Sequence, residues 1–317
     1  MISGQTLSKH PVVSTRDGVS LAVHDTGPRS AEHTVVFLHG LCLNQTLWDR
    51  QISYLRRRYG RSVRVISYDH RGHGRSASAP MSTYRIDQLA DDLAQVLTAL
   101  EVSGPLTLVG HSMGGMTALA YLGRPAVERP IEPGGLVLVA TAAGKLTERG
   151  LARLLATPAP AALVGLIEHT PAHAVHALVG PVRATLSRWH GHGDGARLAA
   201  TVVGALTGTP VATAVGFLPS LRAYDQYPTL ASIHAHTVVI SGGADPLTPA
   251  THAADLAAGI AGAQHVRVPY AGHMLPQLVP HVINDAIRRT ISGAGCIAGR
   301  RVVEHRVHQT LDAAATG

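Results

Sequence analysis

The sequence is poor in cysteine, in aromatic residues and in long apolar runs, and each shortage excludes a class of protein. Its two cysteines, Cys42 and Cys296, exclude a disulfide scaffold; their spacing suggests no metal site or redox pair, and we expect free thiols. Aromatic residues make up 4% of the chain and do not cluster beside basic residues, which argues against nucleic-acid binding despite a net charge of +7. No apolar run reaches the ~18 residues of a membrane span, and the first residues lack the apolar core of a secretory signal. A cytoplasmic location is therefore expected.

A periodic alternation of short apolar runs with amphipathic segments is what the sequence does contain. The 317 residues, 45% of them hydrophobic, can bury a sizeable core. The alternation predicts an α/β fold, in which a mostly parallel, doubly wound sheet carries helices on both faces. Before it, residues 12–25 alternate around Asp17-Gly18 and predict a hairpin. The expected strands then cover residues 34–38, 63–68, 106–109, 136–139, 237–240 and 265–268, and the main helices 47–59, 86–100, 249–260 and 276–291.

The alternation fails in one internal segment, which divides the chain into four parts. Residues 1–142 and 218–291 are expected to form the two halves of the α/β core. Between them, residues 143–217 are rich in Ala, Leu, Val, His and Gly without a convincing strand, and they predict an inserted helical cap or lid. Residues 292–317 show no strong period and are expected to be an appendage, flexible in part.

The sharpest motif is GHSMG at residues 110–114, which lies between the LTLV strand and the helical run MTALAYL. A serine hydroxyl is a poor nucleophile and must be held exposed, in a tight turn, where a base can reach it. Gly110 and Gly114 permit such a turn, although short Gly and Ser motifs also occur in ordinary turns. Its position between strand and helix favours Ser112 as a catalytic nucleophile.

Acyl transfer needs hydrogen-bond donors for the oxyanion, and two backbone amides are candidates. The N–H of Met113, next after the nucleophile, is the first. The second is the N–H of Leu41, which follows His39-Gly40 at the end of the TVVFL strand. Without Ser112, a simple glycine turn and a packed histidine would explain the same residues.

The general base must be one of 20 histidines, and His273 has the expected position. It lies in PYAGHMLP, a glycine-containing loop after the HVRV strand, whereas His265 begins a strand and His281 lies in a helix. Asp245 in SGGADPLTP is the candidate acid, with helix capping as its alternative role. The order Ser112, Asp245, His273 brings three loops to one edge of a parallel sheet.

Two further polar clusters are interpreted as structural. DHRGHGRS at residues 69–76 follows a strand and is rich in turn residues, so we expect a loop held by pairing of Asp69 with Arg71 or by backbone hydrogen bonds. His169, His173 and His176 have helical spacing, but Pro171 interrupts the turn and no acidic or Cys ligand completes a metal site. No metal or cofactor is therefore expected.

The segments FLHG, DHRGHGRS, GHSMGG, GGADPLTP and AGHM, in this order, resemble the α/β-hydrolase family with an inserted lid. The resemblance covers about residues 12–291 apart from the cap. It implies a triad of Ser112, Asp245 and His273, and it implies that DHRGHGRS is a structural loop. A serine nucleophile argues against the epoxide hydrolases and haloalkane dehalogenases of the family, whose corresponding residue is Asp.

These residues predict a serine hydrolase that cleaves a carboxylic ester, a small molecule with an apolar acyl group, through an acyl-enzyme. Lactonase, carbon–carbon bond hydrolase and haloperoxidase-like perhydrolase activities are alternatives, although Leu41 is not the aromatic residue that often follows His-Gly in perhydrolases. A ligand receptor on the same fold is the alternative outside the enzymes. Apolar surface for the substrate is expected from cap residues Leu163, Val164, Leu166, Ile167, Leu178 and Val179.

Overall fold

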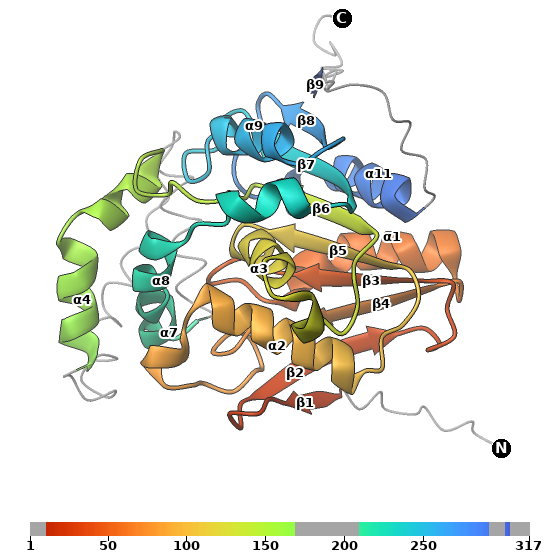
Figure 1. Cartoon of the computed structure of the whole chain (residues 1–317), viewed down its shortest axis with the longest axis horizontal. Coiled ribbons are helices and arrows are strands. Elements are labelled where there is room, and N and C mark those ends of the chain that lie inside the picture. Colours follow the sequence, from red (N-terminus) through yellow and green to blue (C-terminus); the bar gives the residue numbers. More distant parts are fainter. Residues whose placement is uncertain (1–10, 169–208, 292–301, 305–317) are drawn as a thin grey trace, which may run out of the picture.

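The computed structural model describes residues 11–168, 209–291 and 302–304, which form one sheet flanked by helices (Figure 1). The strand order is β1-β2-β4-β3-β5-β6-β7-β8-β9. β2 is antiparallel to β1 and to β4, and every pair from β4 onward is parallel. The predicted hairpin and the predicted mostly parallel, doubly wound sheet are therefore confirmed.

The strands lie close to the predicted ranges. Their bounds are β1 Val12–Ser14, β2 Ser20–Thr26, β3 His33–Leu38, β4 Val63–Tyr68, β5 Leu106–His111, β6 Gly135–Val139, β7 His236–Gly242, β8 Gln264–Val268 and β9 Val302–Glu304. β9 was not predicted, because three residues are too few to show a period against the polar sequence around them. It pairs in parallel with β8 at the edge of the sheet.

The helices follow the strands as the alternation predicted. The α-helices are α1 Asp49–Tyr59, α2 Ile86–Ala99, α3 Met113–Leu122, α4 Ala159–Glu168, α7 Val211–Gly216, α8 Leu218–Ala223, α9 Ala250–Gly259, α10 Leu275–Leu278 and α11 Pro280–Ile291. The short 3₁₀ helices are η1 Gln45–Trp48, η2 Met81–Thr83, η3 Ala126–Glu128, η4 Leu151–Ala156 and η5 Tyr227–Ser232. None of the helices in these ranges combines the length and apolar character that a membrane-spanning helix needs.

The central strands supply two separate cores, one on each face of the sheet. Because successive side chains of a strand point to opposite faces, Val36 and Leu38 of β3 pack toward α2, α3 and α9, whereas Val35 and Phe37 pack toward α1 and α11. All four side chains are fully buried, and each contributes about 1.5–3 kcal/mol through removal from water. This double cover holds the strand ends, and the loops that follow them, in fixed positions.

The predicted cap is described only in part, because residues 169–208 lie outside the described ranges. The described part of residues 143–217 contains η4, α4 and α7 and no strand. α4, α7 and the following α8 lie beyond the carboxyl ends of the parallel strands (Figure 1). The cap boundaries remain a prediction.

Two kinds of contact were predicted to hold the DHRGHGRS loop, an Asp69–Arg71 ion pair and backbone hydrogen bonds, and only the second is found. Arg71 does not pair with Asp69; its guanidinium donates to Asp92 at 2.6 and 2.7 Å and to Asp17 at 2.8 Å. Asp69 instead accepts backbone N–H groups of Gln45 at 2.8 Å and Arg75 at 2.9 Å. The pairing of Asp69 with Arg71 was wrong because the buried Arg71 reaches carboxylates distant in sequence, and the prediction of backbone hydrogen bonds was right.

Candidate active site

Ser112 is the single residue between β5 and α3, and its backbone is strained. Its φ of +52° is in the left-handed region, which costs a non-glycine residue of the order of 1 kcal/mol. The turn is held by the Ser112 N–H, which donates to the carbonyl of Val139 at 2.9 Å, and by the Thr141 hydroxyl, which donates to the Ser112 carbonyl at 2.7 Å. A Cβ on Gly114 would lie 2.2 Å from the Leu38 carbonyl oxygen, so this position requires glycine. The packing of the sheet therefore maintains the turn.

Asp245 and His273 are hydrogen bonded to each other. His273 Nδ1 lies 2.8 Å from Asp245 Oδ2. The carboxylate also accepts the N–H groups of Leu247 at 2.9 Å and Thr248 at 3.1 Å, and the Thr248 hydroxyl at 2.7 Å. Burial raises the pKa of Asp245, but the hydrogen bonds from His273 and Thr248 outweigh it, so the pKa lies below its ordinary value. An ionised Asp245 accepts the Nδ1–H of His273 and leaves Nε2 free to accept a proton.

Ser112 and His273 line the same cavity, of about 250 Å³. No hydrogen bond joins Ser112 Oγ to His273 within the described residues, and such contacts are often long in the absence of substrate. Leu41 and Met113 line this cavity as well. Neither of their backbone amides has an acceptor in the described part of the chain, which leaves both N–H groups available for an oxyanion. Four of the five residues singled out in the sequence, Leu41, Ser112, Met113 and His273, therefore line one cavity, and the fifth, Asp245, is hydrogen bonded to His273 behind it.

The remaining cavity wall is apolar, and most of it was not predicted. Its other lining residues are Gly40, Cys42, Leu43, His111, Met116, Leu146, Ala152, Leu155, Leu221, Leu247, Thr248 and Met274. The described cap residues 163–167 do not line it, whereas Leu146, Ala152, Leu155 and Leu221 do. Residues 178 and 179 lie outside the described ranges. Periodicity identified apolar helices in this segment, but which helix faces the catalytic loops depends on tertiary packing.

His111, which precedes Ser112, makes a contact that was not predicted from the sequence. Its side chain is fully buried, and its Nε2 lies 3.0 Å from the carbonyl oxygen of His273. Burial and then the nearby His273 lower the pKa of His111 to about 3. The neutral ring therefore donates its Nε2–H to the main chain of the His273 loop and links that loop to the turn that carries Ser112. The motif contains this histidine, but nothing in the sequence indicates a partner 162 residues away.

Cys42 also lines the cavity and is a free thiol, as predicted. Burial raises the pKa of this thiol to about 12, so it stays protonated near neutral pH and is a weak nucleophile. Cys296 and the histidines 169, 173 and 176 lie outside the described ranges. Within the described residues, no three His, Cys, Asp or Glu side chains come together as a metal site would require.

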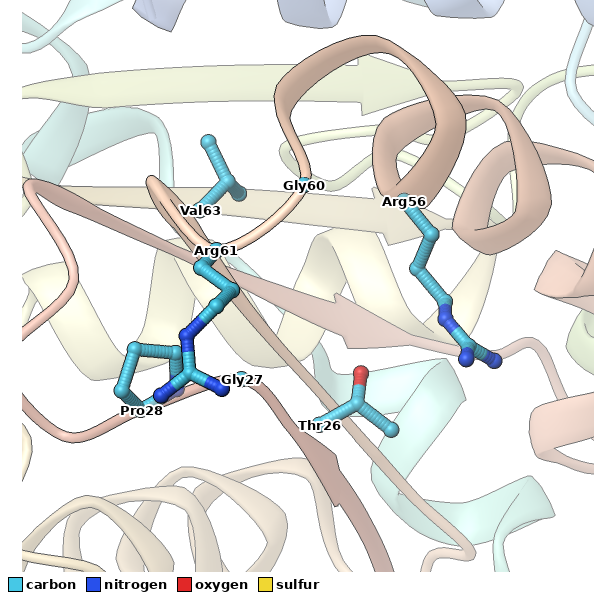
Figure 2. A pocket seen from close by; sticks show the side chains of 7 residues that line it. All are labelled: Thr26, Gly27, Pro28, Arg56, Gly60, Arg61 and Val63. Carbon is cyan, nitrogen blue, oxygen red and sulfur yellow. The ribbon is translucent and has the colours of Figure 1, made fainter.

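A second, larger hollow lies away from these residues (Figure 2). It measures about 510 Å³ and is lined by Thr26, Gly27, Pro28, Arg56, Gly60, Arg61 and Val63. Val63 is the first residue of β4, so this hollow lies at the amino ends of the parallel strands, opposite the loops that carry Ser112 and His273. Its two arginines are exposed, and its lining residues include no histidine, aspartate or glutamate that could act as a general base. The larger hollow is therefore not the one that brings the candidate nucleophile and base together.

Buried neutral histidines predict a loss of stability in mild acid. Burial lowers the pKa of His70 to about 3 and of His73 to about 4, as it does for His111. Below the ordinary pKa of 6.5 the unfolded chain binds more protons than the folded chain. The free energy of unfolding should therefore fall as the pH drops from 6.5 toward 4, by about 2 kcal/mol per histidine at pH 5.

Urea unfolding at pH 7 and pH 5 measures this loss, because few carboxylates become protonated between these two values. His111→Gln has no titrating group at that position and should show a smaller difference between the two pH values. Equal free energies of unfolding at both pH values would show that these rings are not held neutral.

Comparison with protein families matches residues 33–276 to the family described as alpha/beta hydrolase fold. The 3-oxoadipate enol-lactonase 1 of Acinetobacter baylyi is 30% identical over 246 residues, which are 76% of this chain and 81% of that protein. A bifunctional esterase/perhydrolase of Acinetobacter calcoaceticus is 38% identical over 112 residues, 35% of this chain and 38% of that protein. Among solved structures, a hydrolase from Pseudomonas aeruginosa is similar with a TM-score of 0.67 and 26% identity, over 90% of this chain and 99% of that one.

Proposed function

The chain belongs to the α/β-hydrolase fold family, and from this premise we propose that it is a serine hydrolase that cleaves a carboxylic ester through Ser112, His273 and Asp245. The observation that carries the proposal is a strained serine and a histidine in one apolar cavity, with an ionised carboxylate 2.8 Å from the far side of that histidine. This is the arrangement that activates a serine hydroxyl.

In the first half-reaction, His273 Nε2 takes the proton of Ser112 Oγ while Oγ attacks the carbonyl carbon of the ester. The oxyanion that forms accepts hydrogen bonds from the amides of Leu41 and Met113. His273 then gives the proton to the leaving alkoxide, and the alcohol departs from the acyl-enzyme. In the second half-reaction, His273 deprotonates a water while the water attacks the carbonyl carbon of the acyl-enzyme. The bond from that carbon to Ser112 Oγ then breaks, His273 returns the proton to Oγ, and the acid is released. None of these steps requires a metal ion or an organic cofactor.

A fluorophosphonate probe together with p-nitrophenyl butyrate tests the proposal. The probe should label the protein at Ser112, and each equivalent of labelled protein should remove one equivalent of ester hydrolysis. Labelling of a protein that does not turn over any ester would favour the ligand receptor. No labelling and no turnover would refute the serine hydrolase.

Perhydrolysis is the second candidate, and the similarity to a bifunctional esterase/perhydrolase favours it. In that reaction, hydrogen peroxide would replace water in the attack on the acyl-enzyme and release a peracid. Peracid formation from acetate and hydrogen peroxide, compared with ester hydrolysis by the same preparation, separates the two activities. A lactone is a cyclic ester, so similarity to an enol-lactonase is compatible with the same half-reactions.

The cavity predicts a preference for uncharged acyl groups. The titratable side chains in its described lining are His111, His273 and the protonated Cys42. The described lining contains no lysine or arginine. A carboxylate taken from water into such a wall would lose its hydration without gaining a partner, at a cost of several kcal/mol. We therefore expect kcat/KM for p-nitrophenyl butyrate to exceed that for the p-nitrophenyl half-ester of adipic acid by about 100-fold or more.

A series of p-nitrophenyl esters from acetate to octanoate, with the adipate half-ester as the charged member, measures this preference. Faster hydrolysis of the half-ester than of the neutral ester of equal length would mean that a cation reaches the acyl group, and this interpretation of the cavity would be wrong.

A further inference from the structure

Three buried histidines from two motifs pack against one another below the loop that contains Leu41. His39 follows β3, whereas His70 and His73 belong to the loop after β4. The ring of His39 lies 4.4 Å from that of His70 and 5.2 Å from that of His73, measured between centroids. Burial and then the neighbouring His70 and His73 hold the pKa of His39 well below its ordinary value. All three rings are neutral near pH 7, so each has one N–H donor and one acceptor nitrogen.

The hydrogen bonds of His39 determine which of its nitrogens carries the proton. The backbone N–H of His70 donates to His39 Nε2 at 2.9 Å, so this nitrogen must be the acceptor. The proton is therefore on Nδ1, which lies 2.8 Å from the carbonyl oxygen of Gly40 and donates to it. The loop after β4 thus selects the tautomer of His39 that holds the Gly40 carbonyl.

The Gly40 carbonyl and the Leu41 N–H belong to one peptide group. In a planar trans peptide the C=O and the N–H point in opposite directions, so a ring that holds the Gly40 oxygen also sets the direction of the Leu41 N–H. Leu41 N–H is one of the two amides assigned above to the oxyanion. His39 therefore acts on the oxyanion donor without touching the substrate.

His73 holds the next peptide group, between Leu41 and Cys42, by its N–H. Its Nδ1 lies 3.0 Å from the carbonyl oxygen of Arg71 and donates to it, which leaves Nε2 to accept the Cys42 N–H at 3.1 Å. Cys42 has a φ of +60°, a conformation that needs support in a residue other than glycine. Both peptide groups that flank Leu41 are thus held by histidine nitrogens.

We propose that His39 and His73 are positioning residues for the oxyanion hole, and that the DHRGHG segment serves to fix the tautomer and place of these two rings. The sequence and the family resemblance indicated only a structural loop there. The inference rests on the proposed function, because it concerns an oxyanion formed on Ser112. It predicts that changes in these rings affect the transition state more than the binding of substrate.

His39→Asn and His39→Gln form a matched pair of tests. An Asn side chain brings an N–H donor near the place of Nδ1, so it can still hold the Gly40 carbonyl. A Gln side chain reaches the place of Nε2, so it can still accept from His70 and keep the two loops linked. Positioning of the oxyanion donor predicts that Asn preserves catalysis better, whereas a merely structural link between the loops predicts that Gln does.

The measurements are kcat and KM per active site, with active sites counted from the burst of p-nitrophenol, and the inhibition constant of a trifluoromethyl ketone with an alkyl chain. Ser112 Oγ adds to the carbonyl carbon of this ketone, and the resulting hemiketal oxygen occupies the oxyanion hole. We expect His39→Gln to lower kcat about 10- to 100-fold with KM within about threefold, less than the 10²- to 10³-fold cost of losing an oxyanion donor. The inhibition constant should rise in proportion, and His39→Asn should stay within about threefold of the wild type in both.

His73→Gln and His73→Phe give a second pair, which decides the question if a His39 variant does not fold. Gln can accept the Cys42 N–H, whereas Phe keeps the ring contacts with His39 and Phe217 but has no acceptor. The Phe variant should lose kcat and ketone affinity together, and the Gln variant should regain most of both. Wild-type kcat per active site in His73→Phe, or a larger loss in His39→Asn than in His39→Gln, would overturn the inference. A wild-type protein without labelling or turnover would refute the proposed function instead.

Discussion

Ser112→Ala is expected to abolish fluorophosphonate labelling and to lower kcat for p-nitrophenyl butyrate by roughly 10⁴- to 10⁶-fold, the range seen when a catalytic serine is removed. The substitution removes only Oγ, and the turn is held by backbone groups and by the Thr141 hydroxyl, which donates to the Ser112 carbonyl rather than to its side chain. The thermal midpoint Tm should therefore stay within about 2 °C of the wild type. Substitutions that remove no packing, capping or buried hydrogen bond usually change the free energy of unfolding by less than ~0.5 kcal/mol.

Ser241→Ala is the matched control, because Ser241 already makes a hydrogen bond with a histidine. Its hydroxyl lies 2.8 Å from His265 Nε2, yet both side chains are buried in the sheet and neither lines the catalytic cavity. A serine that no ester can reach cannot be the nucleophile, so this variant should keep full labelling and turnover per folded molecule. Labelling that persists in Ser112→Ala and disappears in Ser241→Ala would transfer the nucleophile to Ser241.

The candidate triad could be proposed from the sequence because each member lies in the turn or loop that follows a parallel strand. The carboxyl ends of parallel strands meet at one edge of a sheet, so a motif after β5 and loops after β7 and β8 come together whatever the details of packing. Contacts between those loops could not be predicted in the same way. His111 holds the main chain of His273, and Thr248 donates to Asp245, but both roles depend on distances that only the folded chain defines.

Charge pairs and cavity walls show the same limit. Asp69 and Arg71 are two residues apart and were expected to pair, but the buried Arg71 reaches Asp92 on α2 and Asp17 in the first hairpin. A buried guanidinium needs more than one acceptor, and those acceptors come from whichever elements cover it. The apolar segment of the cap was similarly recognised by composition, but the residues of the predicted cap that line the cavity are Leu146, Ala152 and Leu155, and the rest of the described wall comes from outside the cap.

In a family of this kind, the acid of the triad can follow either of two strands. The residues after β6 are Thr141, Ala142, Ala143 and Gly144, none of which is acidic. The loop after β7 contains Asp245, whose carboxylate is within 2.8 Å of His273 Nδ1. Asp245 should therefore fix the His273 tautomer with Nε2 unprotonated and stabilise the imidazolium that forms during acylation.

Asp245→Asn is expected to lower kcat by roughly 10²- to 10⁴-fold. The asparagine amide can donate to His273 Nδ1, which would then hold the proton on Nε2, so the ring could no longer accept the proton of Ser112. The backbone N–H groups of Leu247 and Thr248 can still be accepted by the amide oxygen, so we expect Tm to change by only a few degrees. Steady-state kinetics on p-nitrophenyl butyrate, with active sites counted by the burst, measure the loss.

Two other aspartates serve as controls for this substitution. Asp225 is exposed and accepts the backbone N–H of Tyr227, so Asp225→Asn should leave both kcat and Tm near the wild-type values. Asp69 is buried and accepts backbone N–H groups of Gln45 and Arg75, so Asp69→Asn should lower Tm by several degrees. Because Asp69 also belongs to the segment proposed to position the oxyanion hole, kcat per active site should fall by no more than the about 10- to 100-fold expected for a positioning residue. Near-normal turnover in Asp245→Asn with a collapse of kcat per active site in either control would assign the acid to that other aspartate. The hydrogen bond between His273 and Asp245 would then only support the loop.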